Sequence, residues 1–240
     1  MSDYRALHQY ADSNAASYDA RRFRALKGRV VDRLEWRLLE RAITDLVAHV
    51  GPLPRVVDVP VGTGRMARRI RAKGCYVVGV DASPDMLALA RAQDSADEYA
   101  TARVEELSRA VPEVDCIVSV RLFGHLPADA KGSALREFSK VATKGAVVFF
   151  AGDTAWLRLR RAVQGRLGRQ LESWSPLTAA EARKLAEACG FVVLGVRSLG
   201  PLSETRALIL AIRDAARPAP AGSANAGHRR GSASSRGAVS

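Results

Sequence analysis

The chain has 240 residues, of which 48% are hydrophobic and 26% are charged. These values suit a single soluble domain, because one hydrophobic core stays undivided up to about 250 residues. No apolar run approaches the roughly 20 residues that cross a bilayer, and the N-terminus lacks the apolar stretch of a signal peptide. We therefore expect a cytoplasmic protein. The three cysteines lie far apart in apolar segments, which predicts no disulfide framework and no metal site.

The net charge of +12 is concentrated in two segments. Residues Arg158–Arg169 hold five arginines, residues Arg217–Ser240 hold four, and neither segment contains an acid. The rest of the chain is only mildly basic, which disfavours an extended nucleic-acid surface, and we predict no specific nucleic-acid partner. The last segment is also rich in Ala, Gly, Ser and Pro without an apolar period, so we expect residues 215–240 to form a disordered basic tail.

Helical and strand patterns alternate along most of the chain. Apolar residues recur with helical spacing from Gly28 to Gly51. The predicted strands that follow are 55–59, 76–80, 114–120, 146–151, 191–196 and 206–212, while 97–106 is ambiguous and could hold one more short strand. The predicted helices are 65–73, one that opens at Ser83-Pro84-Asp85, 128–141, and one that opens with a capping box at Thr178 and Glu181. This alternation predicts a mostly parallel sheet with helices on both faces and a final pair of strands able to form a hairpin.

The turn after the first strand, VVDVPVGTGRMARRI (Val56–Ile70), is the main functional signal. Read loosely, Gly62–Ala67 matches the dinucleotide fingerprint G-x-G-x-x-A, with Asp81 at a suitable distance to bind a ribose. Asp58, however, lies four residues before Gly62, where a carboxylate would repel a pyrophosphate. A ligand that carries positive charge suits this end of the strand better.

The pattern D-x-x-x-G-x-G at the end of the first strand, followed by GVDASPDML at the end of the second, resembles the class I S-adenosylmethionine-dependent methyltransferases. The resemblance spans roughly residues 55–213. It implies an α/β fold, namely a Rossmann-like, doubly wound and mostly parallel seven-stranded sheet with a terminal antiparallel hairpin and helices on both faces. It also implies S-adenosylmethionine as the cofactor. We accordingly divide the chain into a helical lid or cap segment (1–50), a cofactor-binding methyltransferase core (51–214) and the tail (215–240).

The resemblance also assigns a cofactor-binding set. Asp58, Gly62 and Gly64 match the motif that lies against the methionine part of the cofactor, and Asp81 matches the acid that binds the ribose hydroxyls. The remaining predicted cofactor-binding residues are Pro60, Ala82, Met86, Val104 and Val120, of which Ala82 and Met86 match positions near the adenine. The segment VDCIVSVRLFGHL (Val114–Leu126) resembles the motif that closes over the cofactor and faces the acceptor.

Two positions depart from the family pattern. Pro60 stands where the family usually has its first glycine, and it removes a backbone N–H; proline-bearing versions of the motif exist. Arg103 stands where the family often has an acid that receives the adenine amino group. Glu105 or a backbone carbonyl is the candidate to replace that acid.

The candidate catalytic residues are His125 and Asp153. His125 follows the fourth predicted strand, where an acceptor would lie, and could take a proton from a hydroxyl; a lone histidine near a helix start also suits a purely structural role. The predicted function is methyl transfer from S-adenosylmethionine to a small-molecule or lipid-like acceptor. The alternatives are an RNA or protein methyltransferase, a nicotinamide-dependent oxidoreductase or a non-catalytic cofactor-binding module. The arginines of Arg158–Arg169 would favour an anionic acceptor or a peripheral contact with an anionic membrane, unless the segment is a solvated face.

Overall fold

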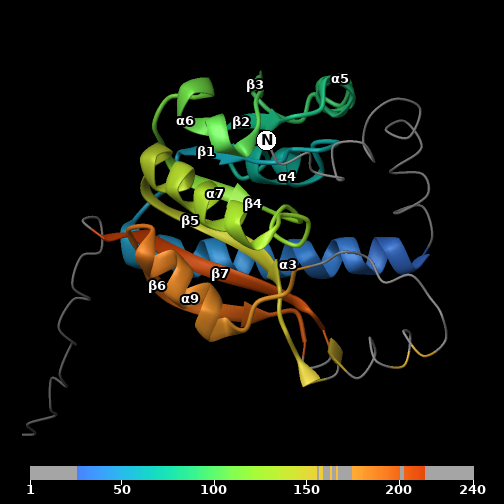
Figure 1. Ribbon diagram of the computed structural model, residues 1–240. Coiled ribbons are helices and arrows are strands. Elements are labelled where there is room, and N and C mark those ends of the chain that lie inside the picture. Colours follow the sequence, from blue (N-terminus) through green and yellow to red (C-terminus); the bar gives the residue numbers. More distant parts are fainter. Residues whose placement is uncertain are drawn as a thin grey trace, which may run out of the picture.

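The computed structural model describes residues 26–155, 157–158, 163, 166, 175–200 and 203–213. Within these ranges the strands form one seven-stranded sheet of order β3-β2-β1-β4-β5-β7-β6 (Figure 1). The strands are β1 (Arg55–Asp58), β2 (Tyr76–Asp81), β3 (Glu98–Thr101), β4 (Val114–Ser119), β5 (Ala142–Ala151), β6 (Phe191–Ser198) and β7 (Thr205–Ile212). The helices are α3 (Leu26–Val50), α4 (Arg65–Arg71), α5 (Pro84–Ala92), the 3-10 turn η1 (Val104–Glu106), α6 (Leu107–Ala110), α7 (Ala128–Val141) and α9 (Ala179–Ala188).

The sheet confirms the predicted α/β class and the predicted mixture of parallel and antiparallel strands. Strands β1 to β5 pair in parallel, and β7 pairs antiparallel with both β5 and β6. The ambiguous segment 97–106 does contain a strand, β3. Strand β5 starts at Ala142, earlier than the predicted 146, because α7 ends at Val141 and the chain enters the sheet directly.

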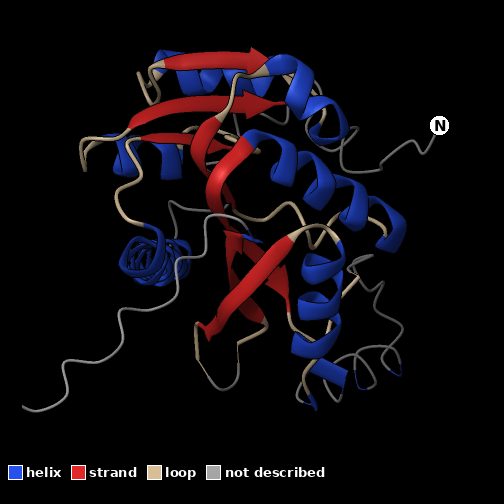
Figure 2. Ribbon diagram, turned by 90° about the vertical axis from the view of Figure 1, so that its left-hand side faces the viewer, coloured by secondary structure: helices blue, strands red, loops and turns tan. Residues whose placement is uncertain are grey.

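Helices cover both faces of the sheet. Buried residues of α3, α4 and α5 share one hydrophobic cluster with one face, and those of α6, α7 and α9 share a second cluster with the other. Figure 2 shows the long helix α3 end-on at one face, with α7 and α9 at the opposite face. Among the described residues, none of the helices has the length and apolar character needed to cross a membrane.

Helix α3 belongs to the packed body of the protein. Its stripe Leu38, Leu39, Ala42 and Leu46 is buried in the cluster that contains residues of β5 and β7. Burial of each leucine side chain contributes about 1.5–3 kcal/mol. Residues 1–25 of the predicted lid segment and the tail from 214 onward lie outside the described residues, so the division at 50 and 214 stays a prediction.

The strand order places the candidate site. Chain order reverses between β1 and β4, and a crevice forms outside the carboxyl ends of the strands at such a switch point. Asp58 and Asp81 are the last residues of the adjacent strands β1 and β2. Both predicted acids therefore lie at the same edge of the sheet.

Candidate active site

A cavity opens at the carboxyl ends of β1, β2, β3 and β4. It is lined by all of the predicted cofactor-binding residues except Gly64, and by the predicted catalytic residue His125. The remaining lining residues are Val59, Val61, Thr63, Arg65, Met66, Ser83, Ala102, Arg103, Glu105, Arg121, Leu122 and Leu126. The Val59–Pro60 peptide bond in its wall is cis.

The two glycines of the first turn have different surroundings. Both have positive φ, +54° at Gly62 and +80° at Gly64, a conformation that glycine adopts without steric cost. Gly62 lines the cavity, whereas Gly64 faces the loop before β3. A Cβ at Gly64 would lie 2.0 Å from the Oγ of Ser95, so this glycine permits close packing behind the cavity wall.

Asp81 joins the turns that follow β1 and β2. Its Oδ2 accepts the backbone N–H of Gly62 at 2.9 Å, and its Oδ1 accepts the N–H of Ser83 at 2.9 Å. Ser83 in turn caps α5 by accepting the N–H of Met86. Burial raises the pKa of Asp81, while the backbone donors oppose that rise. A carboxylate has about four lone-pair sites, so Asp81 keeps acceptor capacity toward the cavity.

Asp58 is a carboxylate buried at the carboxyl end of β1. Both of its oxygens are inaccessible, and neither meets a donor among the described residues. Burial raises its pKa from about 3.8 to about 7, although the positive charge of Arg65 and the nearby Ala67 amide act in the opposite direction. Such a group is costly unless a ligand completes its contacts. A cationic ligand group would do so, and this cavity therefore fits the positively charged cofactor that the resemblance implies.

Three charged residues beside the cavity had not been predicted. Arg65 is the first residue of α4, Arg121 follows β4, and both line the cavity. Both also pair with Glu35 of α3, which is only 4% exposed. Glu35 stands three residues before Leu38 on the buried stripe of α3. An acid at an apolar position of a helical pattern was the sequence signal that could have identified it.

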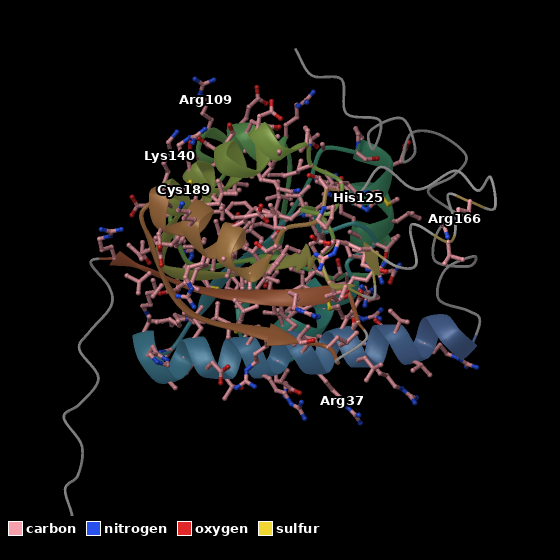
Figure 3. The ribbon with its side chains drawn as sticks, turned by 60° about the horizontal axis from the view of Figure 1, so that its bottom comes forward. Arg37, Arg109, His125, Lys140, Arg166 and Cys189 are labelled. Carbon is pink, nitrogen blue, oxygen red and sulfur yellow. The ribbon has the colours of Figure 1, made fainter. Side chains whose placement is uncertain are left out.

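His125 lies in the loop between β4 and α7 and lines the cavity. Figure 3 labels it to the right of Cys189, which follows α9. The backbone N–H of His125 donates to the backbone carbonyl of Leu122 at 2.9 Å. The Ser175 N–H donates to the Gly124 carbonyl at 3.4 Å, and the buried Lys131 ammonium donates to the Ser175 carbonyl. These contacts anchor the loop that carries the candidate base.

The other candidate catalytic residue lies elsewhere. Asp153 is not among the cavity-lining residues, and its Oδ2 accepts from Nη1 of Arg158 at 2.8 Å. In the cavity wall, Oε2 of Glu105 lies 3.7 Å from Nε of Arg103. Both line the cavity, so a carboxylate is present near the position where the sequence departs from the family. Most of Arg158–Arg169 lies outside the described residues.

Comparisons with known proteins agree with this geometry. Residues 56–145 match the family described as a methyltransferase domain. An uncharacterized methyltransferase of Bacillus thuringiensis (strain Al Hakam) is 32% identical over 115 residues, which are 48% of this chain and 51% of that protein. Residues 56–145 of this chain therefore resemble a methyltransferase domain. It spans about half the length of the curated relatives it matches.

The chain also resembles solved structures over most of its length. Magnesium protoporphyrin IX methyltransferase from Synechocystis PCC 6803, solved with bound SAH, has a TM-score of 0.71 and 18% identity over 88% of this chain and 100% of that chain. A possible histamine N-methyltransferase from Thermotoga maritima has a TM-score of 0.61 and 17% identity over 86% of this chain and 99% of that chain. At these identities the likeness concerns the fold alone.

Proposed function

We propose that this protein transfers a methyl group from S-adenosylmethionine to an oxygen, nitrogen or carbon nucleophile on a small or lipid-like molecule. The observation that carries the proposal is the buried carboxylate of Asp58, which meets no hydrogen-bond donor among the described residues and lines the same cavity as Asp81. Two acids at adjacent strand ends suit a ligand with a cationic group at one end and vicinal hydroxyls nearby. They do not suit the pyrophosphate of a nicotinamide dinucleotide.

The cavity residues divide into groups with different roles. Asp58 binds the ammonium of the methionine part, and Asp81 accepts hydrogen bonds from the ribose hydroxyls. Ala82, Met86 and Val104 supply an apolar surface for the adenine. Pro60, Gly62 and Val120 complete the wall.

S-adenosylmethionine, when bound, supplies an electrophilic methyl group on a sulfonium. The protein's contribution is then to hold an acceptor in line with that carbon and to exclude water, and such orientation is worth about 7–11 kcal/mol in favourable cases. His125 is the candidate base that removes a proton from a hydroxyl or amine acceptor. Its position in the cavity wall next to Leu126 supports that role.

The acceptor is proposed to be small or lipid-like and anionic. Arg158–Arg169 leaves the sheet after β5, whose carboxyl end lies on the same edge as the cavity. Its arginines would draw a phosphate or carboxylate group toward the mouth of the site.

Incubation of the purified protein with a metabolite extract and S-adenosylmethionine carrying an isotopically labelled methyl group tests the proposed function. We expect label in one or a few small or lipid-like products. A matched His125→Asn variant should bind the cofactor normally and form labelled product more slowly. If the label enters only RNA or protein, the proposed acceptor class is wrong; if no label is transferred to any fraction, the chain is a binding module.

A further inference from the structure

We propose that the outer face of α3 docks the protein on an anionic membrane surface. This face comprises two exposed apolar side chains and a row of four exposed arginines, namely Val30, Leu34, Arg29, Arg33, Arg37 and Arg41. The surface is separate from the cavity, and membrane binding requires neither cofactor nor methyl transfer.

The four arginines form a row because of their spacing. They follow one another at intervals of four residues, and side chains four residues apart are neighbours on the surface of an α-helix. The opposite side of α3 carries the buried leucine stripe that packs on the sheet. Figure 3 shows Arg37 projecting from α3 away from the sheet, whereas Arg109 lies at the top of the same view. The row therefore lies on the solvent side of the helix.

The acids of α3 do not neutralise this row. The helix contains four acids, and each of them pairs with a cation on another element. The pairs are Asp32 with Arg65 and Arg69, Glu35 with Arg65 and Arg121, Glu40 with Lys73, and Asp45 with Arg197. Within the described part of the chain, none of the four arginines of the row forms an ion pair with an acid. The outer face of α3 therefore keeps an unbalanced positive charge.

The apolar side chains on this face decide which anionic partner fits it. Val30 is 46% exposed and Leu34 is 37% exposed, and they lie one helical turn apart beside the arginines. At the boundary between lipid headgroups and acyl chains, apolar side chains are buried while arginines contact anionic headgroups. The phosphate backbone of a nucleic acid would pair with the arginines but would offer Val30 and Leu34 no apolar partner. The combination of charge and apolar exposure favours an anionic lipid surface.

The N-terminal half of the face lies near the cavity. Asp32 and Glu35, which alternate with residues of the row, both pair with Arg65 in the cavity wall. A membrane docked on α3 would therefore lie toward the edge of the sheet at which the cavity opens. Delivery of a lipid-like acceptor from that membrane rests on the proposed function, whereas the membrane contact does not.

Co-sedimentation of the full-length protein with vesicles tests the proposal. One set of vesicles contains phosphatidylcholine and phosphatidylglycerol in equal parts, and the other contains phosphatidylcholine alone. We expect the wild type to bind the anionic vesicles and not the neutral ones. The combined variant Arg33→Gln, Arg37→Gln and Arg41→Gln should bind the anionic vesicles roughly 10- to 100-fold more weakly, because each basic residue near an anionic surface adds to the attraction.

A matched variant controls for the loss of net charge. The changes Arg109→Gln, Arg136→Gln and Lys184→Gln remove the same charge from exposed positions of α6, α7 and α9, which cover the other face of the sheet. This control should bind the vesicles as the wild type does. Both triple variants should keep the wild-type melting temperature, because substitutions at exposed positions rarely affect stability.

The double variant Val30→Ser and Leu34→Ser tests the apolar contribution at constant charge. We expect several-fold weaker binding to the anionic vesicles, because two side chains that enter the headgroup boundary are lost. Unchanged binding would overturn the membrane assignment, since a purely electrostatic contact would suit any polyanion. Polyuridylate is the probe for a nucleic-acid partner. If the wild type binds polyuridylate and not the anionic vesicles, the proposal fails.

Three further outcomes would overturn the proposal. The wild type could fail to bind the anionic vesicles, the α3 arginine variant could bind them as tightly as the wild type, or the charge-matched control could weaken as much as the α3 variant. The second outcome would assign the contact to another basic segment, and the third would assign it to net charge alone. A protein that binds anionic vesicles through α3 but transfers no methyl group would keep this surface and lose only the proposed function.

Discussion

Replacement of Asp58 by asparagine should stabilise the ligand-free protein at neutral and higher pH while it weakens cofactor binding. In the folded protein the pKa of Asp58 is about 7, against an ordinary value of about 3.8. Ionisation of this buried group therefore costs the folded state free energy, and the cost grows as the pH rises from about 4 to about 7. The difference between these two pKa values corresponds to a free energy of about 4 kcal/mol at high pH. The asparagine variant avoids that cost at every pH.

The assay is urea unfolding of the ligand-free wild type and Asp58→Asn at pH 4.5 and pH 8. A buried asparagine amide has a cost of its own, about 1–3 kcal/mol if unpaired, but this cost is the same at both pH values. The change between the two pH values in the stability difference isolates the carboxylate and should be about 3 kcal/mol in favour of the variant, because Asp58 is already mostly ionised in the unfolded chain at pH 4.5. Asp94→Asn, which removes a carboxylate whose side chain is 85% exposed, is the control and should show little pH dependence.

The same variant should bind S-adenosylmethionine roughly 10- to 100-fold more weakly at pH 8, because the ammonium loses its charged partner. Wild-type affinity should itself rise as the pH passes through about 7, since only the ionised form of Asp58 binds a cation well. A stability difference that is equal at pH 4.5 and pH 8 would refute the reasoning. It would mean that Asp58 is not an uncompensated buried charge.

Three further predictions follow from the cavity and the basic segments. Gly64→Ala should destabilise the protein by several kcal/mol and weaken cofactor binding, because the added Cβ overlaps Ser95 and the φ of +80° is strained; thermal unfolding measures this, and an unchanged melting temperature would contradict it. Truncation after Arg217 should leave the melting temperature and cofactor affinity unchanged, and a large fall in either would show that the tail packs. Replacement of Arg158, Arg160 and Arg161 by glutamine should raise the Michaelis constant for an anionic acceptor, or reduce binding to acidic vesicles, while cofactor affinity stays unchanged. If neither the Michaelis constant nor vesicle binding changes at low salt, these arginines only form a solvent-exposed charged surface.

The sequence predicted the elements that have strong local signals. The capping box at Thr178 and Glu181 and the Ser83 cap are both formed as expected, because a cap depends only on residues within one helical turn. The ambiguous strand β3 is half exposed and lacks a clear apolar alternation. Its pairing with β2, which no local pattern encodes, makes it a strand.

The candidate-site residues at strand ends and in the turns that follow them were predictable from the sequence. Asp58, Gly62 and Asp81 occupy strand ends and turns, and the parallel sheet brings strand ends together. The Glu35 cluster was not predictable in this way, because its members come from α3, α4 and the end of β4. Their meeting depends on how α3 packs across the sheet. Asp153 follows β5, but its side chain pairs with Arg158 and is not among the residues that line the cavity, so its catalytic role stays a prediction.

Calorimetric titration of S-adenosylmethionine and NAD into the wild-type protein and Asp81→Ala tests the central claim most directly. The account predicts that the wild type binds S-adenosylmethionine and not NAD, and that Asp81→Ala weakens S-adenosylmethionine binding by roughly 10- to 100-fold through loss of charge-assisted hydrogen bonds. NAD binding by the wild type, or an unchanged affinity for S-adenosylmethionine in Asp81→Ala, would contradict it.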